Sequence, residues 1–132
     1  MIGLDTNILI RYIVQDEPLQ SRKAVKFIEQ ECSDESSVFI NAIILCELVW
    51  VLESGYEYSR EEISIVLEKI LRTRQFYIAD THILWQALSD YQHKGVDFSD
   101  SYIAHYNIHS GCKTTITFDK KASRLAQMKL LT

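Results

Sequence analysis

The sequence predicts an α/β fold in which helices cover both faces of a parallel sheet. Short apolar runs with the length of buried strands recur along the chain, and longer amphipathic or apolar segments separate them. Strands that alternate with helices pair in parallel, because each helix carries the chain back across a face of the sheet. The 132 residues, 47% of them hydrophobic, can build one core and contain no linker-like stretch, so we expect a single domain over residues 1–132.

The first half of the chain predicts two strands and three helices. Pro18 suits the first turn of a helix, where its missing N–H costs nothing, and Asn41 suits an N-cap. Ser54-Gly55 ends the third helix. The expected elements are a strand at Ile2–Leu4, helices at Asn7–Val14 and Glu17–Cys32, a strand at Val38–Ile40 and a helix at Ala42–Glu53.

The second half predicts two more strands and four more helices. Ser59 and Glu62 have the spacing of a capping box, in which each side chain bonds the backbone of the other residue. We expect Asp80 to cap the following helix and Gly95 to close it. The expected elements are helices at Arg60–Arg72, Asp80–His93, Asp97–His109 and Lys120–Met128, and strands at Phe76–Ile78 and Thr114–Thr117.

Cysteine content and charge narrow the class of protein. Cys32, Cys46 and Cys112 are odd in number and widely spaced, which predicts neither a disulfide framework nor a zinc ribbon and favours a reducing compartment. No leader-like segment and no apolar run of membrane-spanning length stand in the sequence, so we expect a cytoplasmic protein with no membrane partner. The formal charge of −4 is unusual for a nucleic-acid-binding protein, which normally carries a basic surface.

Four aspartates lie where an α/β sheet binds its ligands. Asp5 follows the first expected strand and Asp119 the last, while Asp97 and Asp100 open the helix that leads into the last strand. Ligands of open α/β sheets bind at the carboxyl ends of the strands. Taken alone, each of these aspartates is equally well explained as an ordinary N-cap, and Asp97 with Asp100 as a capping pair.

Glu47 is the most informative single residue, because it lies in a strongly apolar helix. Its neighbours three and four positions away are Ile43, Ile44, Trp50 and Val51, so its own helix offers no cation. A buried, unpaired carboxylate costs several kcal/mol. Glu47 therefore needs water at an exposed helix edge, a basic residue from elsewhere, or a metal ion.

Several carboxylates in one pocket repel one another and require a cation. Two unit charges about 4 Å apart interact by roughly 4 kcal/mol at an effective dielectric constant near 20. Oxygen ligands of this kind suit Mg²⁺ or Mn²⁺ better than zinc. Such an ion activates water and stabilises charge on a phosphate group.

In these residues the sequence resembles the PIN-domain nucleases, and among them the VapC-like toxins of bacterial and archaeal toxin–antitoxin pairs. The resemblance runs from Ile2 to about Leu125 and depends on several motifs in order. Relatives often carry consecutive alanines where this chain reads Ile103-Ala104-His105. The motifs are Asp5-Thr6-Asn7, Glu47 in an apolar helix, Asp97-Phe98-Ser99-Asp100 leading into Ser101-Tyr102-Ile103-Ala104, and Thr117-Phe118-Asp119.

The resemblance implies a three-layer α/β/α fold with a central parallel sheet of four to five short strands. It also implies Mg²⁺- or Mn²⁺-dependent endonucleolytic cleavage of RNA, a homodimer, and a cognate antitoxin whose tail fills the groove near the active site. We expect cleavage by water to leave 5′-phosphate and 3′-hydroxyl ends. By analogy, the catalytic and metal-binding acids are Asp5, Glu47, Asp100 and Asp119, the auxiliary metal ligand is Asp97, and the residues that orient these groups are Asn7 and Thr117.

Basic residues could form a rim that contacts RNA phosphates without reading sequence. Setting aside the five candidate metal ligands changes the formal charge from −4 to +1, so the acidic balance does not exclude RNA. Lysines of a terminal helix are, however, equally well explained as solvated surface residues. The candidates are Arg11, Lys120, Lys121 and Arg124, with Arg72 and Arg74 less firmly placed.

Two other functions remain as alternatives to the ribonuclease. One is a receiver-like, Mg²⁺-dependent phosphoacceptor domain, which also uses aspartates together with a threonine and a lysine. Thr117 and Lys120 could fill these two positions, but this function gives Glu47 no role. A non-catalytic binding module would need the acids only as helix caps. His105 and His109 have a spacing that binds zinc, but no third ligand matches them.

Overall fold

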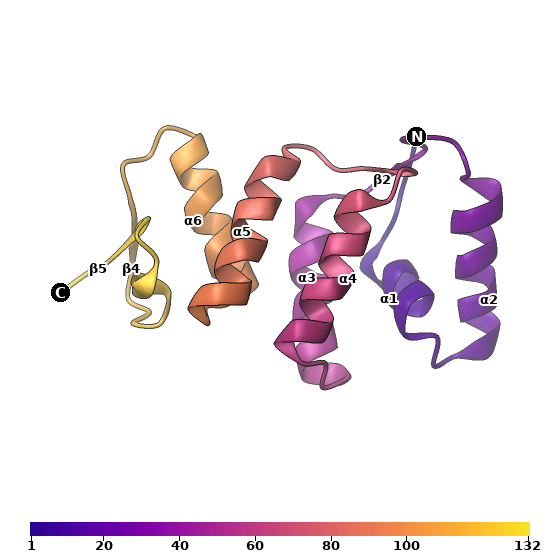
Figure 1. The fold of residues 1–132 in the computed structure, drawn as a ribbon, viewed down its shortest axis with the longest axis horizontal. Helices are drawn as coiled ribbons and strands as arrows, with labels where there is room; N and C mark the ends of the chain where they lie inside the picture. The colour runs from indigo at the N-terminus through magenta and orange to yellow at the C-terminus, as the bar shows by residue number, and fades with distance from the viewer. The chain divides into compact units, whose positions relative to one another are not determined.

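The computed structural model describes all 132 residues, which form two compact units, Met1–Ala79 and Asp80–Thr132 (Figure 1). Five strands are present, and every pair of neighbouring strands is parallel, as predicted. Three strands belong to the first unit and two to the second. None of the helices combines the length and apolar character needed to cross a membrane.

The sheet of the first unit has the strand order β1-β2-β3. Ile2 is in register with Val38, and Val38 with Phe76. Because parallel strands all end at the same edge of a sheet, the residues that follow them gather there. Asp5 follows β1 at this edge. The strands are β1 (Ile2–Gly3), β2 (Val38–Phe39) and β3 (Phe76–Tyr77).

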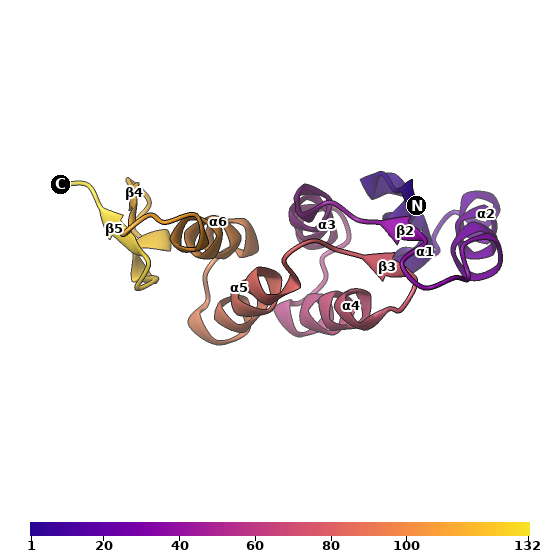
Figure 2. The ribbon, with the colours of Figure 1, turned by 90° about the horizontal axis from the view of Figure 1, so that it is seen from above.

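Helices connect these strands, and most begin and end as the sequence predicts. Glu17 caps the helix that starts at Pro18, Asn41 caps the next one, and Ser59 forms the predicted capping box with Glu62. α1 packs against both α2 and α3, and α3 against α4 (Figures 1 and 2). The elements are α1 (Thr6–Val14), α2 (Pro18–Lys26), the π-helix η1 (Phe27–Glu31), α3 (Ala42–Gly55) and α4 (Arg60–Arg72).

The second unit is built on a pair of packed helices and a two-stranded parallel sheet. Tyr91 and Phe98, both fully buried, meet edge to face with ring centroids 6.0 Å apart. A second buried cluster consists of Val96, Ala104, Ala122, Leu125 and Met128. The elements are α5 (Thr81–Lys94), α6 (Phe98–His109), β4 (Thr115–Thr117), the 3₁₀ helix η2 (Ala122–Arg124) and β5 (Met128–Leu130).

The terminal helix predicted at Lys120–Met128 was wrong. The chain makes only the single turn η2, becomes extended at Leu125, and then forms β5, where Met128 pairs with Thr115. Pairing with β4 satisfies the backbone polar groups of this segment while Leu125 and Met128 stay buried. Apolar residues three apart fit both a helix and this arrangement, so their spacing did not distinguish the two.

Two smaller predictions also differ from the structure. The helix expected to reach Cys32 changes from α-helix to π-helix at Phe27. Asp80 precedes α5 but has a left-handed backbone with φ of 53°, and its side chain makes no capping bond. The other predicted boundaries are correct to within one or two residues.

Candidate active site

Asp5 and Glu47 are both held by the residue between them in space, Thr6. The backbone N–H of Thr6 donates to Asp5 Oδ1 at 2.7 Å, and the Thr6 hydroxyl donates to Glu47 Oε2 at 3.3 Å. Thr6 itself is buried, whereas both carboxylates are exposed. The fold thus brings together two acids that are 42 positions apart in the sequence and keeps them accessible to a ligand.

Glu47 lies on the exposed side of its apolar helix, as one of the sequence interpretations required. Leu45, Leu48 and Val49 face the core, while Glu47 does not. The chain gives it no cationic partner, and its contact with Thr6 is a hydrogen bond from a neutral hydroxyl. Its negative charge is therefore available to a ligand.

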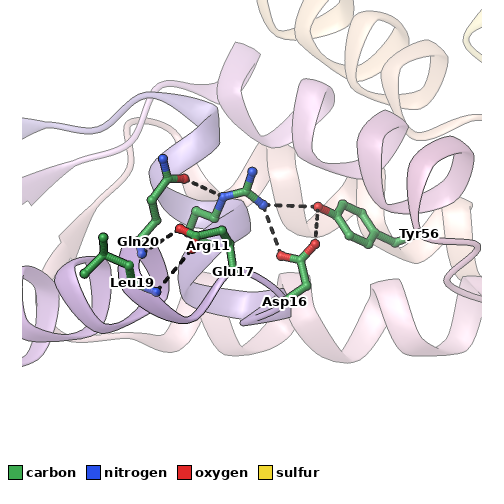
Figure 3. A network of polar contacts seen from close by, with 6 residues as sticks. All are labelled: Arg11, Asp16, Glu17, Leu19, Gln20 and Tyr56. Atoms are coloured by element: carbon green, nitrogen blue, oxygen red, sulfur yellow. Dashed lines mark hydrogen bonds and ion pairs between the residues drawn. The ribbon is translucent and has the colours of Figure 1, made fainter.

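Asn7 and Arg11 line a cavity of about 1010 Å³ in the first unit, together with Asp5. Arg11 is not a free cation. Its guanidinium donates to Gln20 at 2.8 Å, to Asp16 at 3.1 Å and to Tyr56 at 3.3 Å (Figure 3).

This network holds the Arg11 guanidinium in one position at the wall of the cavity. The hydrogen bond to Tyr56, supported by the charge of Asp16, raises the pKa of Arg11 above its ordinary value. Tyr56 in turn donates to Asp16 at 3.0 Å, so one carboxylate holds both partners (Figure 3). Arg11, predicted as a phosphate contact, therefore reaches the cavity with its side chain already held in place.

The charges of Asp97 and Asp119 act on a third acid of the second unit, Asp100. Burial raises the pKa of Asp100 first, and the negative charges of Asp97 and Asp119 raise it further, while Lys121 opposes the shift. A carboxylate responds in this way when like charges lie nearby. The structure therefore places Asp97 and Asp119 near enough to Asp100 for their charges to act on it.

Asp97 and Asp119 differ in their use as helix caps. Asp97 stands at the N-cap of α6, but its side chain bonds no backbone N–H and instead lies 3.4 Å from Lys121 Nζ. Asp119 does cap, because its Oδ1 accepts from Lys121 N at 2.9 Å and from Ala122 N at 3.1 Å. Helix capping thus explains the position of Asp119 but not that of Asp97. The second carboxylate oxygen of Asp119, Oδ2, forms no hydrogen bond within the protein.

Thr117 positions Asp119 through the backbone. Its hydroxyl accepts from the backbone N–H of Asp119 at 3.0 Å, which fixes the turn after β4. Of the predicted phosphate contacts nearby, Lys121 is paired with Asp97, while Lys120 and Arg124 are exposed and form no ion pair. Lys120 is therefore free to contact a phosphate, whereas Lys121 already has an acidic partner.

His105 and His109 point to different partners, so they do not form a zinc pair. His105 Nε2 lies 2.5 Å from Asp90 Oδ2, and Lys94 binds the other oxygen of Asp90 at 3.2 Å. His109 Nε2 lies 2.6 Å from His82 Nε2. His105 thus bonds α6 to the buried Asp90 of α5.

The donor atoms of both units suit a hard divalent cation. They are carboxylate oxygens with exposed or partly exposed positions, which leave room for retained water. Neither unit by itself gathers three acidic, histidine or cysteine side chains closely enough for a complete metal site. Thr6 is the residue that the sequence analysis missed; only its place between Asp5 and Asn7 in the first motif could have indicated it.

Comparison with known proteins identifies the family. The PIN domain family matches residues 2–128 of the chain. A VapC ribonuclease from Aquifex aeolicus is 25% identical over 122 residues, which cover 92% of this chain and 90% of that protein. No solved structure matches the chain significantly. The match over nearly the whole length shows that the chain belongs to the PIN-domain family.

Proposed function

We propose that the protein is a Mg²⁺- or Mn²⁺-dependent endoribonuclease and the toxin of a toxin–antitoxin pair. Family membership and the similarity to a VapC ribonuclease support a nuclease and set aside the receiver-like alternative. The observation that carries the proposal is the environment of Asp100, whose pKa is raised by burial and further by the negative charges of Asp97 and Asp119. Such mutual repulsion is typical of acids arranged for a ligand rather than for stability.

In this proposal the acids that the sequence analysis singled out form the metal centre. Its ligands would be Asp5, Glu47, Asp97, Asp100 and Asp119, with Asn7 and Thr117 as orienting residues. A bound divalent ion would lower the pKa of water and neutralise charge on the phosphate group. Thr6 would keep Asp5 and Glu47 in place, and Thr117 would do so for Asp119.

Asp100 would bind the ion favourably, because a cation offsets the burial and the negative charges that raise its pKa in the metal-free protein. Water would attack the phosphorus, the bond from phosphorus to the 3′ oxygen would break, and that oxygen would leave as a hydroxyl. The products would carry 5′-phosphate and 3′-hydroxyl ends, and Lys120 and Arg124 would contact neighbouring phosphates.

The proposed partners follow from the same similarity. The relative is named as a VapC ribonuclease, and we extend that activity to this chain together with a cognate antitoxin, a homodimeric state and a cytoplasmic location. RNA supplies the phosphodiester that the acidic centre requires. We also propose that residues 1–132 act as one nuclease domain.

Cleavage of RNA by the purified protein, freed of antitoxin, tests the proposal. We expect cleavage with Mg²⁺ or Mn²⁺, none after chelation, and none with Asp5→Asn or Asp100→Asn. Asp34→Asn, which changes an exposed aspartate outside the predicted site, should cleave normally. Absence of cleavage by the wild type with either ion, or normal cleavage by Asp5→Asn, would contradict the proposal.

A further inference from the structure

The cavity of the first unit connects a predicted catalytic residue with a basic helix. Asp5 and Asn7 contribute to its lining from the start of α1, and Lys23 and Lys26 contribute from α2. Its volume of about 1010 Å³ is at the upper end of the range for small-molecule pockets, so a chain-like ligand fits it better than a single small group.

Lys23 and Lys26 are the free cations of this cavity. They are three positions apart on one helix, which places them as neighbours on its surface. Both are exposed, and neither forms a hydrogen bond or an ion pair. Arg11 adds a third cation, held by its network with Asp16 and Tyr56 (Figure 3).

The local charge of α2 differs from that of the whole chain. The chain has 18 acidic and 14 basic residues, but the nine residues of α2 contain three basic and no acidic ones. Lysines in the last turn also stabilise a helix through its dipole. That effect does not depend on the cavity. It does not explain why both lysines line the cavity unpaired, where three cations, Arg11 included, face only the two acids Asp5 and Glu31.

We infer that this cavity binds the phosphodiester backbone of the RNA substrate on one side of the cleaved bond, through Lys23 and Lys26. The inference rests on the proposed ribonuclease function, because the polymer that reaches Asp5 must continue across a neighbouring surface. Phosphate contacts by lysine position a nucleic acid without reading its sequence. Phe27, half-buried in the cavity lining, offers a ring on which a base stacks.

Binding of a labelled single-stranded RNA of roughly 12 nucleotides, measured in chelator over a range of salt concentrations, tests this inference. Each lysine that contacts a phosphate contributes about 0.7 to the slope of log affinity against log salt. Lys23→Gln/Lys26→Gln should lower that slope by about 1.4 and weaken binding at low salt about tenfold. Lys23→Arg/Lys26→Arg should restore both quantities.

Arg22→Gln is the matched control, since it removes a cation of the same helix that does not line the cavity. It should leave the slope unchanged. An unchanged slope in Lys23→Gln/Lys26→Gln, or an equal loss in Arg22→Gln, would overturn the inference. So would a loss of affinity for a glutamate-rich peptide with RNA binding intact, which would identify a peptide groove instead.

The measurement separates this inference from the ribonuclease proposal. Binding is recorded without metal and without cleavage, so it does not depend on the acidic centre. Cleavage that requires Asp5 together with an unchanged salt slope would leave the nuclease standing and remove the cavity as its RNA-binding surface. If the slope falls in the double variant but the wild-type protein cleaves no RNA, the cavity remains an RNA-binding surface and the nuclease proposal fails.

Discussion

Thr6 illustrates which parts of the site could be predicted from single residues. Asp5 and Glu47 stood out in the sequence, because one follows a strand and the other lies in an apolar helix. The hydroxyl of Thr6 carries no such signal. Its bond to Glu47 spans 41 positions, and only the packing of α1 against α3 brings the two together.

Thr6→Val removes that hydroxyl while keeping the side-chain shape and the backbone N–H that binds Asp5. We expect a 10- to 100-fold loss in Mn²⁺ affinity or in kcat, the range found when partners of metal ligands are changed. Thr6→Ser keeps the hydroxyl and should stay close to the wild type. Equal behaviour of the valine variant and the wild type in a Mn²⁺ titration would show that Thr6 does not position Glu47.

The pKa of Asp100 should respond in opposite directions to two neighbouring substitutions. Asp97→Asn removes a negative charge that raises this pKa, so the pKa should fall. Lys121→Gln removes a positive charge that lowers it, so the pKa should rise. NMR titration of the Asp100 carboxyl carbon in metal-free protein measures both. Shifts of the same sign in the two variants would mean that Asp97 and Lys121 do not act on the Asp100 carboxylate with opposite charges.

Asp100→Asn should make the metal-free protein slightly more stable near neutral pH. Because the folded state raises the pKa of Asp100, the ionised carboxylate disfavours folding, and this penalty appears as the pH rises through the range between the unfolded and folded pKa values. The site is partly solvated, so the gain should not exceed about 0.5 kcal/mol. Thermal unfolding at neutral and at acidic pH measures it. If Asp100→Asn is less stable than the wild type at neutral pH, the ionised Asp100 carboxylate does not disfavour folding and this prediction is wrong.

Helix starts were the most predictable elements, because capping depends on residues only three positions apart. The capping box of Ser59 and Glu62 and the bounds of α4 appear as expected. The end of the chain was predicted wrongly, since β5 depends on a strand that the local pattern does not reveal. Local signals determined the helices, and distant pairing determined the last strand.

Ser59→Ala should lower the free energy of unfolding by about 1 kcal/mol, because it leaves the backbone N–H of Glu62 without its side-chain acceptor. Ser59→Asp keeps an acceptor at the cap and should retain most of the stability. Urea unfolding of the three proteins checks the order. If Ser59→Ala is as stable as the wild type, the capping box does not contribute to the stability of α4.

At the scale of the whole molecule, the α/β class and the parallel pairing of strands were predictable from the alternation of short apolar runs and helices. The division into Met1–Ala79 and Asp80–Thr132 was not. An apolar pattern indicates that a residue is buried but does not name the residues that bury it. The acidic balance of the chain likewise does not by itself indicate a function, because it does not show which acids lie together.

The proposed function depends on the binding of a divalent ion by the predicted acids. Calorimetric titration of the wild type, Asp5→Asn and Asp119→Asn with Mn²⁺ tests it most directly, with Asp34→Asn as the control. We predict saturable binding at a whole-number ratio by the wild type and the control, and loss of that binding in each of the other two variants. Absence of binding by the wild type, or unchanged binding by Asp5→Asn or Asp119→Asn, would contradict it.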